Sequence, residues 1–458
     1  MARYIAREHL QTLQQCLFRG PVQSFNHPVL RYQNLLSALS TGSCVYSQQR
    51  QQSCCFSSSS VLSPCPRYGR NQRREISTSL KACSIKDKKL FTPGPLGVTL
   101  SVKEAMLRDV GSRDTEFIDT VKFIRTKLLD IAGVNNGEFS CIPIQGSGTF
   151  AIDASFQTFL PREGAKALII ENGAYGKRMA KICESAGISC DVQSFREDRS
   201  VEPEVVEDAL SGQTKYDLVS IVHCETSSGV FNPVTAVGNL VREISPETVY
   251  MVDAISAFGA IPLDIEGSSV DVMVSSANKC LQGVPGFAFV IARNSVLDKC
   301  KGNSRSLSLD LYDQVKQLDQ THQFRFTPAT HSMLAFRQAL LEFEQEGGVT
   351  GRANRYKENR EILRNGMTAL GFQELLAENI AGYIITSYMY PKDPNFDFKE
   401  FYNRLNEKNL VIYPGKVLDA DCFRIGSIGD LHKEDMTTLL AAIKEVCADM
   451  NISVPVQN

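Results

Sequence analysis

Four short apolar runs recur in the middle of the chain, and each of them stops at polar residues. The runs lie at residues 167–170, 218–222, 249–252 and 272–274, and Ser220 is the one polar residue inside them. Segments with helical character lie between them. Continuous apolar runs of this length are typical of strands in a parallel sheet, because helices cover both faces of such a sheet. The sequence therefore predicts an α/β fold with a mostly parallel sheet.

The polar residues that follow these runs are expected to meet. The carboxyl ends of parallel strands lie at one edge of a sheet, and ligands bind beyond that edge. The strand ends carry Glu225, Thr226 and Ser227, then Asp253, then Ser276 and Lys279. Acidic groups, hydroxyl groups and a single lysine are thereby predicted to lie along one rim of the sheet.

The pattern changes after about Thr330. Apolar residues then step by three and four, which predicts a helix that Gly347 and Gly348 end. Three short apolar stretches and a final amphipathic helix follow, and this mixture indicates a smaller α+β domain. We expect a leader over residues 1–87, an N-terminal arm with a large α/β domain over 88–330, and a small C-terminal α+β domain over 331–458.

The first part of the chain differs in charge from the rest. Residues 1–74 hold nine arginines, no lysine and one acid, Glu8. The remainder of the chain has a formal net charge of −10. An arginine-rich, serine-rich and acid-poor opening is typical of an organelle transit peptide, and we expect the mitochondrial matrix as its destination. The alternative is that this N-terminal segment carries no targeting signal and that the protein is cytoplasmic.

Composition also excludes several classes of partner. The acidic body of the chain argues against nucleic-acid binding, and no apolar run approaches the roughly 20 residues that a membrane span needs. Eight cysteines follow the leader without CxxC spacing or a paired histidine, so no metal site is expected. Small molecules remain as the expected ligands.

The stretch QGSGTFAIDA, residues 145–154, places small residues before a helical segment. It fits G-x-G-x-x-A, the fingerprint of dinucleotide binding, but no convincing acid follows about twenty residues later at a second strand end. A simpler interpretation is that Ser147, Gly148 and Thr149 hold a phosphate with their N–H groups and hydroxyls at a helix N-terminus. A plain loop with a helix cap is the third alternative.

Asp253 and Lys279 add a carboxylate and an amine to the same rim. A buried carboxylate needs a cationic partner, although a helix cap or a salt bridge is the commoner use of an acid at a strand end. Ser276 and Lys279 also match the S-x-x-K motif of serine acyl-enzymes, but the chain has neither S-D-N nor K-T-G. A phosphate turn, a carboxylate and a lysine are what pyridoxal 5′-phosphate requires for its phosphate, its ring nitrogen and its aldehyde.

Two more residues are candidates for ligand contacts. Tyr175 follows the first apolar run, where it could stack on the cofactor ring or be a surface tyrosine. Arg424 stands alone in an apolar stretch, which is unusual because arginine is rarely buried without a partner. A structural ion pair is one interpretation of Arg424, and binding of a substrate anion by its guanidinium is the other.

The chain contains the stretches FTPGPLGVTLSVKEAMLRD, NGAYGKRM, VHCETSSGVFNP, VDAISAFGAIPLDI, SSANKCLQGVPGFAFVIAR, SRSLSLDLYDQ and VIYPGKVLDADCFRIGSIG. Together with QGSGTFAIDA, they resemble the 2-aminoethylphosphonate–pyruvate transaminases, a group within the class-V aminotransferases of fold-type I. The resemblance extends over residues 88–448. It implies a large domain with a mostly parallel, seven-stranded sheet and a smaller α+β domain.

The resemblance also implies roles for single residues. Lys279 would bond to the aldehyde of pyridoxal 5′-phosphate, and Asp253 would pair with the ring nitrogen. The remaining cofactor contacts would come from Ser147, Gly148, Thr149, Tyr175, Thr226 and Ser276. Lys279 and Asp253 are thus the expected catalytic residues.

Further residues are implied for the substrate and for a second subunit. Arg424, with the backbone around Pro93 and Gly94, would hold the substrate anion. Thr327 would reach the cofactor phosphate of a partner subunit, so a homodimer with shared sites is implied.

The implied reaction moves the amino group of 2-aminoethylphosphonate to pyruvate in a ping-pong cycle and gives phosphonoacetaldehyde and L-alanine. An alanine- or serine-dependent aminotransferase of the same group, acting on glyoxylate or pyruvate, is an alternative. A pyridoxal-phosphate lyase such as a cysteine desulfurase is a second one. A desulfurase needs a cysteine on a mobile loop, and Cys280 beside the lysine is badly placed for that role.

Overall fold

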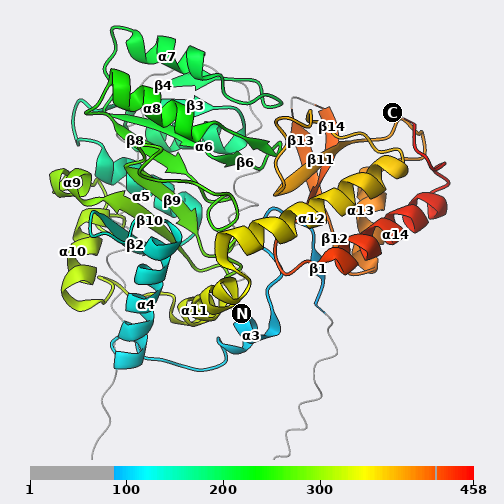
Figure 1. Ribbon diagram of the computed structural model, residues 1–458, viewed down its shortest axis with the longest axis horizontal. Coiled ribbons are helices and arrows are strands. Elements are labelled where there is room, and N and C mark those ends of the chain that lie inside the picture. Colours follow the sequence, from blue (N-terminus) through cyan, green and yellow to red (C-terminus); the bar gives the residue numbers. More distant parts are fainter. Residues whose placement is uncertain (1–86, 418–419, 458) are drawn as a thin grey trace, which may run out of the picture. The chain divides into compact units, whose positions relative to one another are not determined.

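The structure is a computed structural model that describes residues 87–417 and 420–457 (Figure 1). The predicted leader over residues 1–87 lies outside the described residues except for Asp87, and so does the predicted transit peptide. The described residues form one compact unit. In the part of the chain that is described, none of the helices combines the length and the apolar character that a transmembrane segment requires.

A seven-stranded sheet forms the centre of the larger part of this unit. Its order is β2 (Phe139–Gln145), β10 (Phe287–Arg293), β9 (Val272–Ser276), β8 (Val249–Asp253), β5 (Leu218–Val222), β3 (Lys166–Glu171) and β4 (Ser189–Ser194). Only β10 runs antiparallel to its neighbours, β2 and β9, while the pairs from β9 to β4 are parallel. The predicted α/β class with a mostly parallel, seven-stranded sheet is confirmed.

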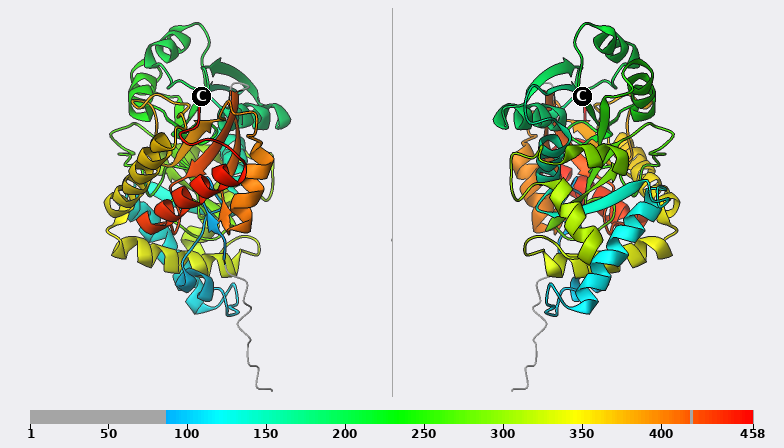
Figure 2. Two further views of the ribbon diagram at one scale, coloured as in Figure 1. Left: turned by 90° about the vertical axis from the view of Figure 1, so that its right-hand side faces the viewer. Right: turned by 90° about the vertical axis from the view of Figure 1, so that its left-hand side faces the viewer.

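Helices pack along this sheet, as the two side views show (Figure 2). They are α4 (Thr115–Ile131), α5 (Gly148–Phe159), α6 (Ala174–Ser185), α8 (Val234–Ile244), α9 (Asn294–Leu297) with a 3-10 turn (Asp298–Cys300), and α10 (Leu311–Thr321). Helix α7 (Pro203–Ser211) packs against α8. Helix α5 contacts β9 and β10, and α6 contacts β3 and β4. Both helices begin at the rim where the parallel strands end.

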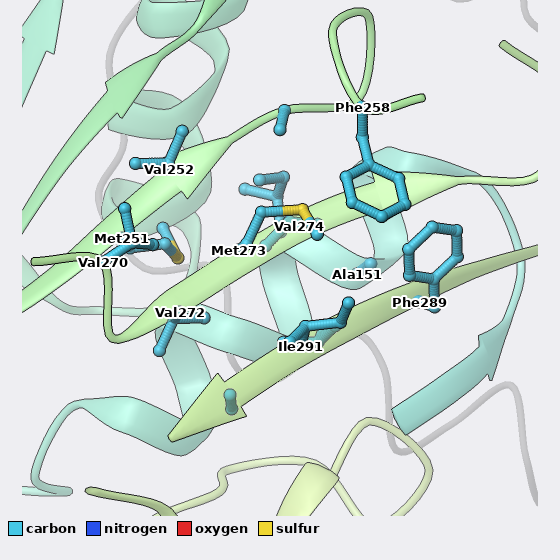
Figure 3. Packing of buried hydrophobic residues seen from close by; sticks show 14 of the residues in the cluster. Ala151, Met251, Val252, Phe258, Val270, Val272, Met273, Val274, Phe289 and Ile291 are labelled. Carbon is cyan, nitrogen blue, oxygen red and sulfur yellow. The ribbon is translucent and has the colours of Figure 1, made fainter. Parts of the chain in front are cut away.

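The core of the sheet explains why the strand sequences are apolar without interruption. Successive side chains of a strand point to opposite faces, so a strand covered on both faces needs apolar residues at every position. Val272, Met273 and Val274 of β9 are all fully buried, and Met251 and Val252 of β8 pack beside them (Figure 3). Each such side chain contributes about 1.5–3 kcal/mol by leaving water.

The C-terminal part has a second, smaller sheet. It is antiparallel in the order β11 (Ile385–Met389), β14 (Ala420–Gly426) and β13 (Tyr413–Val417), as the predicted short strands suggested. Helices α12 (Gly348–Ala369), α13 (Phe398–Glu407) and α14 (Lys433–Asp449) accompany it, and they share with it a separate buried cluster. The N-terminal arm joins this part, because β1 (Lys89–Leu90) pairs with β12 (Leu410–Val411).

Helices α3 (Leu100–Glu104) and α11 (Thr330–Gln345) connect the two parts of the unit. The predicted helix after Thr330 is α11, and it ends two residues before Gly347. Its apolar residues Met333, Phe336, Leu340 and Phe343 belong to the core of the large sheet rather than to the smaller cluster. The predicted domain boundary between residues 330 and 331 stays a prediction.

The long helix α12 was not predicted. Its 22 residues begin at Gly348, directly after Gly347, whose φ of +96° is left-handed. The buried side of α12 includes Arg352, Tyr356 and Asn359 among apolar residues. A helix that buries polar side chains lacks the apolar stripe by which sequence patterns reveal helices.

Candidate active site

The rim of the large sheet surrounds a cavity of about 180 Å³. Its walls come from the ends of β5, β8 and β9 and from the first turns of α5 and α6. Seven residues that the sequence singled out line it: Ser147, Gly148, Thr149, Tyr175, Asp253, Ser276 and Lys279. The predicted meeting of the strand ends at one edge is therefore observed.

The first turn of α5 forms one wall of the cavity. Ser147 is the N-cap residue in an extended conformation, and its side chain makes no capping hydrogen bond within the helix. The first N–H groups of a helix have no partner inside it, so those of Gly148 and Thr149, which line the cavity, are suited to bind an anion. A Cβ atom on Gly148 would come within 2.5 Å of Ile255 Cδ1, which explains the glycine. Backbone donors and two hydroxyls thus converge on one anion-binding corner.

Asp253 is the last residue of β8 and is 5% exposed. One carboxylate oxygen, Oδ1, accepts a hydrogen bond from the Ile255 N–H at 2.9 Å. Burial raises the pKa of Asp253 to about 7, although the backbone bond opposes this shift. A buried carboxylate with so raised a pKa gains most from a cationic partner, because the charge would relieve its desolvation.

Lys279 follows β9 in a turn and reaches the N-terminal arm. Its Nζ donates a hydrogen bond to the carbonyl of Pro93 at 2.7 Å. Gly94 lies so close that a Cβ atom there would stand 2.5 Å from the same Nζ. Burial lowers the pKa of Lys279 to about 8, and Asp253 acts weakly in the opposite direction. An amine with this pKa is partly neutral near pH 7.5 and can act as a nucleophile or base.

Tyr175 is the second residue of α6 and lines the cavity, half-buried. Its N–H donates to Glu225 Oε2 at 3.2 Å. Arg178 follows one turn later and places its guanidinium carbon 4.9 Å from the centre of the Tyr175 ring. Nη1 of Arg178 lies 3.5 Å from the hydroxyl of Thr149. The starts of α5 and α6 are thereby joined at the cavity wall.

Arg424 and Thr226 contact each other beside the cavity but are not among the residues that line it. Nη1 of Arg424 donates to the carbonyl of Thr226 at 2.7 Å, while Nε and Nη2 donate to the carbonyl of Pro414 at 3.1 and 2.7 Å. Burial lowers the pKa of Arg424. Within the described residues Arg424 forms no salt bridge, so the structural ion pair weighed for it is not seen there.

Two hydroxyls at this rim are buried without a hydrogen-bond partner among the described residues. They are the side chains of Thr226 and Ser276, and Ser276 lines the cavity. Buried hydroxyls are rarely left unpaired, so a ligand group is the natural partner for Ser276. Thr327, by contrast, is exposed and lies with Gly146 and Phe150 around a different hollow.

The sequence model of the family "Aminotransferase class-V" matches residues 100–412 of this chain. This span is more than half of the chain and includes both Asp253 and Lys279. The chain belongs to the class-V aminotransferases.

Similar curated proteins of this family come from bacteria. The chain is 46% identical over 358 residues to the 2-aminoethylphosphonate–pyruvate transaminase of Vibrio vulnificus. This match covers 78% of this chain and 96% of that relative. It is 45% identical over 359 residues to the enzyme of the same name from Phocaeicola vulgatus, covering 78% and 98%. A bifunctional phosphonoacetaldehyde hydrolase/aminoethylphosphonate transaminase from Clostridioides difficile is 43% identical, and the match covers 56% of it.

Solved structures of other aminotransferases share the fold. The ureidoglycine–glyoxylate aminotransferase of Bacillus subtilis superimposes with a TM-score of 0.73 at 22% identity, covering 81% of this chain and 95% of that one. The pyridoxamine–pyruvate aminotransferase of Mesorhizobium loti gives 0.73 at 21% identity, covering 81% and 94%. At these identities the likeness supports the fold of this class-V aminotransferase and nothing finer.

The cofactor of this class-V aminotransferase is pyridoxal 5′-phosphate, as the sequence predicted. The groups around the cavity fit it. The start of α5 offers donors for a phosphate, Asp253 offers a carboxylate for the ring nitrogen, and Lys279 offers an amine for the aldehyde. The unpartnered hydroxyl of Ser276 adds a polar group at the same wall.

Two residues at this rim were assigned no role from the sequence. Glu225, in the hairpin β6 (Cys224–Glu225) and β7 (Val230–Phe231), is fully buried. Its carboxylate accepts from the N–H groups of Tyr175 and Gly176 and from Ser227, and burial raises its pKa. Arg178 is the second. Glu225 was visible in the sequence as an acid at the rim, whereas Arg178 became a candidate only through its contact with Thr149.

Proposed function

We propose that this class-V aminotransferase transfers the amino group of 2-aminoethylphosphonate to pyruvate, giving phosphonoacetaldehyde and L-alanine. The observation that carries the proposal is the 45–46% identity to 2-aminoethylphosphonate–pyruvate transaminases over 96–98% of their length. Two solved aminotransferases with glyoxylate in their names are 22% and 25% identical to this chain.

The residues at the cavity divide the work. Bound pyridoxal 5′-phosphate supplies a ring that takes up negative charge from the substrate carbon. Ser147, Gly148 and Thr149 bind its phosphate, and Asp253 keeps a proton on its ring nitrogen by pairing with it. Lys279 would accept the proton from the substrate carbon that bears nitrogen and would deliver it to the carbon on the other side of that nitrogen, C4′ of the cofactor. The lowered pKa of Lys279, about 8, supports this role as a base.

Substrate recognition falls to Arg424 in this proposal. 2-Aminoethylphosphonate has no carboxylate, so its phosphonate is its one anionic group, whereas pyruvate offers a carboxylate. Three N–H groups of Arg424 bond to carbonyls, which leaves two of its five donors without a partner among the described residues. A guanidinium with two donors available can bind either anion in turn, with the backbone of Pro93 and Gly94 beside Lys279 closing the site.

The proposal includes a homodimer. Thr327 is exposed, and the exposed aromatic residues Phe150 and Phe326 lie around the same hollow. Exposed apolar groups of this size gather at protein interfaces. A second subunit on this surface would bring Thr327 toward the start of the partner's α5. Light scattering should give about twice the molar mass of one chain, and a monomer at micromolar concentration would contradict the dimer.

The proposed location is the mitochondrial matrix, and its support is the arginine- and serine-rich composition of residues 1–74. Residues 1–87 fused to a fluorescent protein should direct it to mitochondria. A diffuse cytoplasmic signal would contradict this part of the proposal and leave the reaction untouched.

One experiment tests the reaction. Purified enzyme loaded with pyridoxal 5′-phosphate is given 2-aminoethylphosphonate alone, and the visible absorbance of the bound cofactor is followed. We expect a loss equal to the number of sites and its return when pyruvate is added. Continuous turnover without a keto acid would indicate a lyase. A response to alanine or serine with glyoxylate, but none to 2-aminoethylphosphonate, would indicate the other aminotransferase.

A further inference from the structure

The charges that line the cavity do not balance the cofactor's phosphate unless Arg178 takes part. A phosphate ester carries about −1.5 to −2 charges at pH 7, and a helix N-terminus contributes only about half a positive charge. Two cationic side chains line the cavity, Lys279 and Arg178. Lys279 donates to the carbonyl of Pro93 and is the expected partner of the aldehyde.

Arg178 lies against the first turn of α5, and its charge also acts on Asp253 and Lys279. Its Nη1 is 3.5 Å from the Thr149 hydroxyl in the first turn of α5, so it already lies beside a proposed phosphate ligand. The neighbouring Lys177 differs: its Nζ bonds to Glu197 at 2.6 Å and it does not line the cavity. Within the described residues Arg178 forms no salt bridge, and its charge is therefore available to a ligand.

Arg178 is exposed, and its guanidinium packs against the ring of Tyr175. The guanidinium carbon is 4.9 Å from the ring centre, within the range of a cation–π contact. Tyr175 is in turn held through its N–H by the buried carboxylate of Glu225. A guanidinium that is held in place binds phosphoryl oxygens with two parallel hydrogen bonds and loses little freedom in doing so.

We propose that Arg178 is a ligand of the cofactor's phosphate and supplies the positive charge that the start of α5 lacks. This inference rests on the proposed function, since it takes the start of α5 as the phosphate site. The substrate's phosphonate has the same chemistry as a phosphate ester. The contact with Thr149 favours the cofactor, because Thr149 lies in the anion-binding turn.

The test compares two ligands that differ only in the phosphate. Cofactor-free, full-length protein is titrated with pyridoxal 5′-phosphate and with pyridoxal, and binding is measured by equilibrium dialysis. Arg178→Gln should weaken binding of pyridoxal 5′-phosphate by about 10- to 100-fold and change that of pyridoxal by less than about threefold. Arg178→Lys should lose less, because it keeps the charge. Lys177→Gln, which removes the adjacent charge on the same helix, should change neither affinity.

Other outcomes overturn the inference in distinguishable ways. Equal losses for both ligands would mean that Arg178 acts through the Tyr175 ring. Unchanged cofactor binding with a raised KM for 2-aminoethylphosphonate would mean that it binds the substrate. If Arg178→Gln does not fold, Arg178→Lys is tested in its place. An equal change in its affinities for pyridoxal 5′-phosphate and for pyridoxal would contradict the proposal. Failure of the wild-type protein to bind pyridoxal 5′-phosphate would instead contradict the proposed function.

Discussion

The two parts of the compact unit present their functional groups in different ways. In the large sheet, Asp253 and Lys279 follow the ends of buried aliphatic strands, and the phosphate corner is the start of a helix. In the small sheet, Arg424 lies inside β14, between Phe423 and Ile425. Those two neighbours are buried in the smaller cluster, so strand alternation turns Arg424 to the opposite face.

The cores behind these groups differ as well. The small sheet rests on aromatic rings whose centres lie 5.2–6.4 Å apart. They are Phe372, Tyr388, Tyr390, Phe396, Phe398, Phe401 and Phe423. Large rigid rings fix the position of a strand without contributing any polar group to the site. The large sheet, by contrast, desolvates an acid and an amine and shifts their pKa values toward neutrality.

The hairpin of β6 and β7 joins the two parts. The carbonyl of Thr226 accepts from Arg424, and the carbonyl of Ser228 accepts from Ser387 in β11 at 2.8 Å. The same hairpin carries Glu225, which holds the first turn of α6. Under the proposed function, cofactor binding and the chemistry on the cofactor depend on the large sheet, whereas recognition of the substrate's anionic group depends on Arg424 in the small one. Substitutions in the two parts should separate these properties.

Lys279→Ala should have the largest effect. Removing the amine takes away both the covalent partner of the cofactor and the base, and loss of a base alone costs about 10²- to 10⁴-fold in rate. We expect no measurable transamination in steady-state assays. Borohydride treatment of the wild-type holoenzyme followed by peptide mapping should label residue 279.

The control for this variant is Lys299→Ala, which removes an exposed lysine far from the cavity, paired with Glu247. It should keep wild-type rates and labelling. A borohydride label on any residue other than Lys279 in the wild-type enzyme would refute the assignment of Lys279 as the covalent partner of the cofactor.

Arg424→Ala should have a smaller effect that spares the cofactor. Charge-assisted hydrogen bonds contribute about 1.5–3 kcal/mol each, so loss of one contact lowers kcat/KM by about 10- to 150-fold. Both 2-aminoethylphosphonate and pyruvate should be affected in single-turnover measurements, while the content of bound cofactor stays at one per chain. Arg404→Ala is the control, since Arg404 lies on α13 and pairs with Glu400.

Unchanged kinetics for both substrates in the Arg424→Ala enzyme would show that Arg424, and with it the small sheet, does not bind the substrate. Loss of the cofactor from that variant would show instead that the small sheet is part of the cofactor site.

The large sheet was predictable from sequence because its strands are buried on both faces and end in polar residues. That pattern placed Asp253 and Lys279 at one rim, and the small residues of 146–148 indicated a helix start that lines the same cavity. These features are local in the sequence, so periodicity and composition reveal them. Arg424 was also recognisable, because a lone arginine in an apolar strand is conspicuous.

Features that depend on tertiary contacts were not predictable in the same way. Helix α12 buries Arg352, which bonds to Glu346 at 2.6 Å and to the carbonyl of Cys280 beside the lysine. No pattern in its sequence distinguishes such a charge from a solvated one. Arg178 likewise became a candidate only when the start of α6 was seen beside Thr149.

The smallest expected effect is a pH dependence that separates the two parts of the unit. Lysine reacts with an aldehyde only as the neutral amine, and burial moves the pKa of Lys279 to about 8 from its usual value of about 10.4. The rate of covalent cofactor capture by cofactor-free protein should therefore rise about tenfold per pH unit below pH 8 and level off above it. Below pH 7, protonation of Asp253 should steepen the decline, because its pKa is about 7.

Arg424 provides the control for this pH profile. Its guanidinium stays charged at every pH in the experiment, so Arg424→Ala should leave the profile of capture unchanged. Asp253→Asn should remove the added steepness below pH 7 and keep the levelling near pH 8. Stopped-flow absorbance from pH 6 to 10 measures all three proteins. A capture rate that still rises between pH 9 and 10 would mean that Lys279 titrates like an exposed lysine, and desolvation by the large sheet would then have no part in its reactivity.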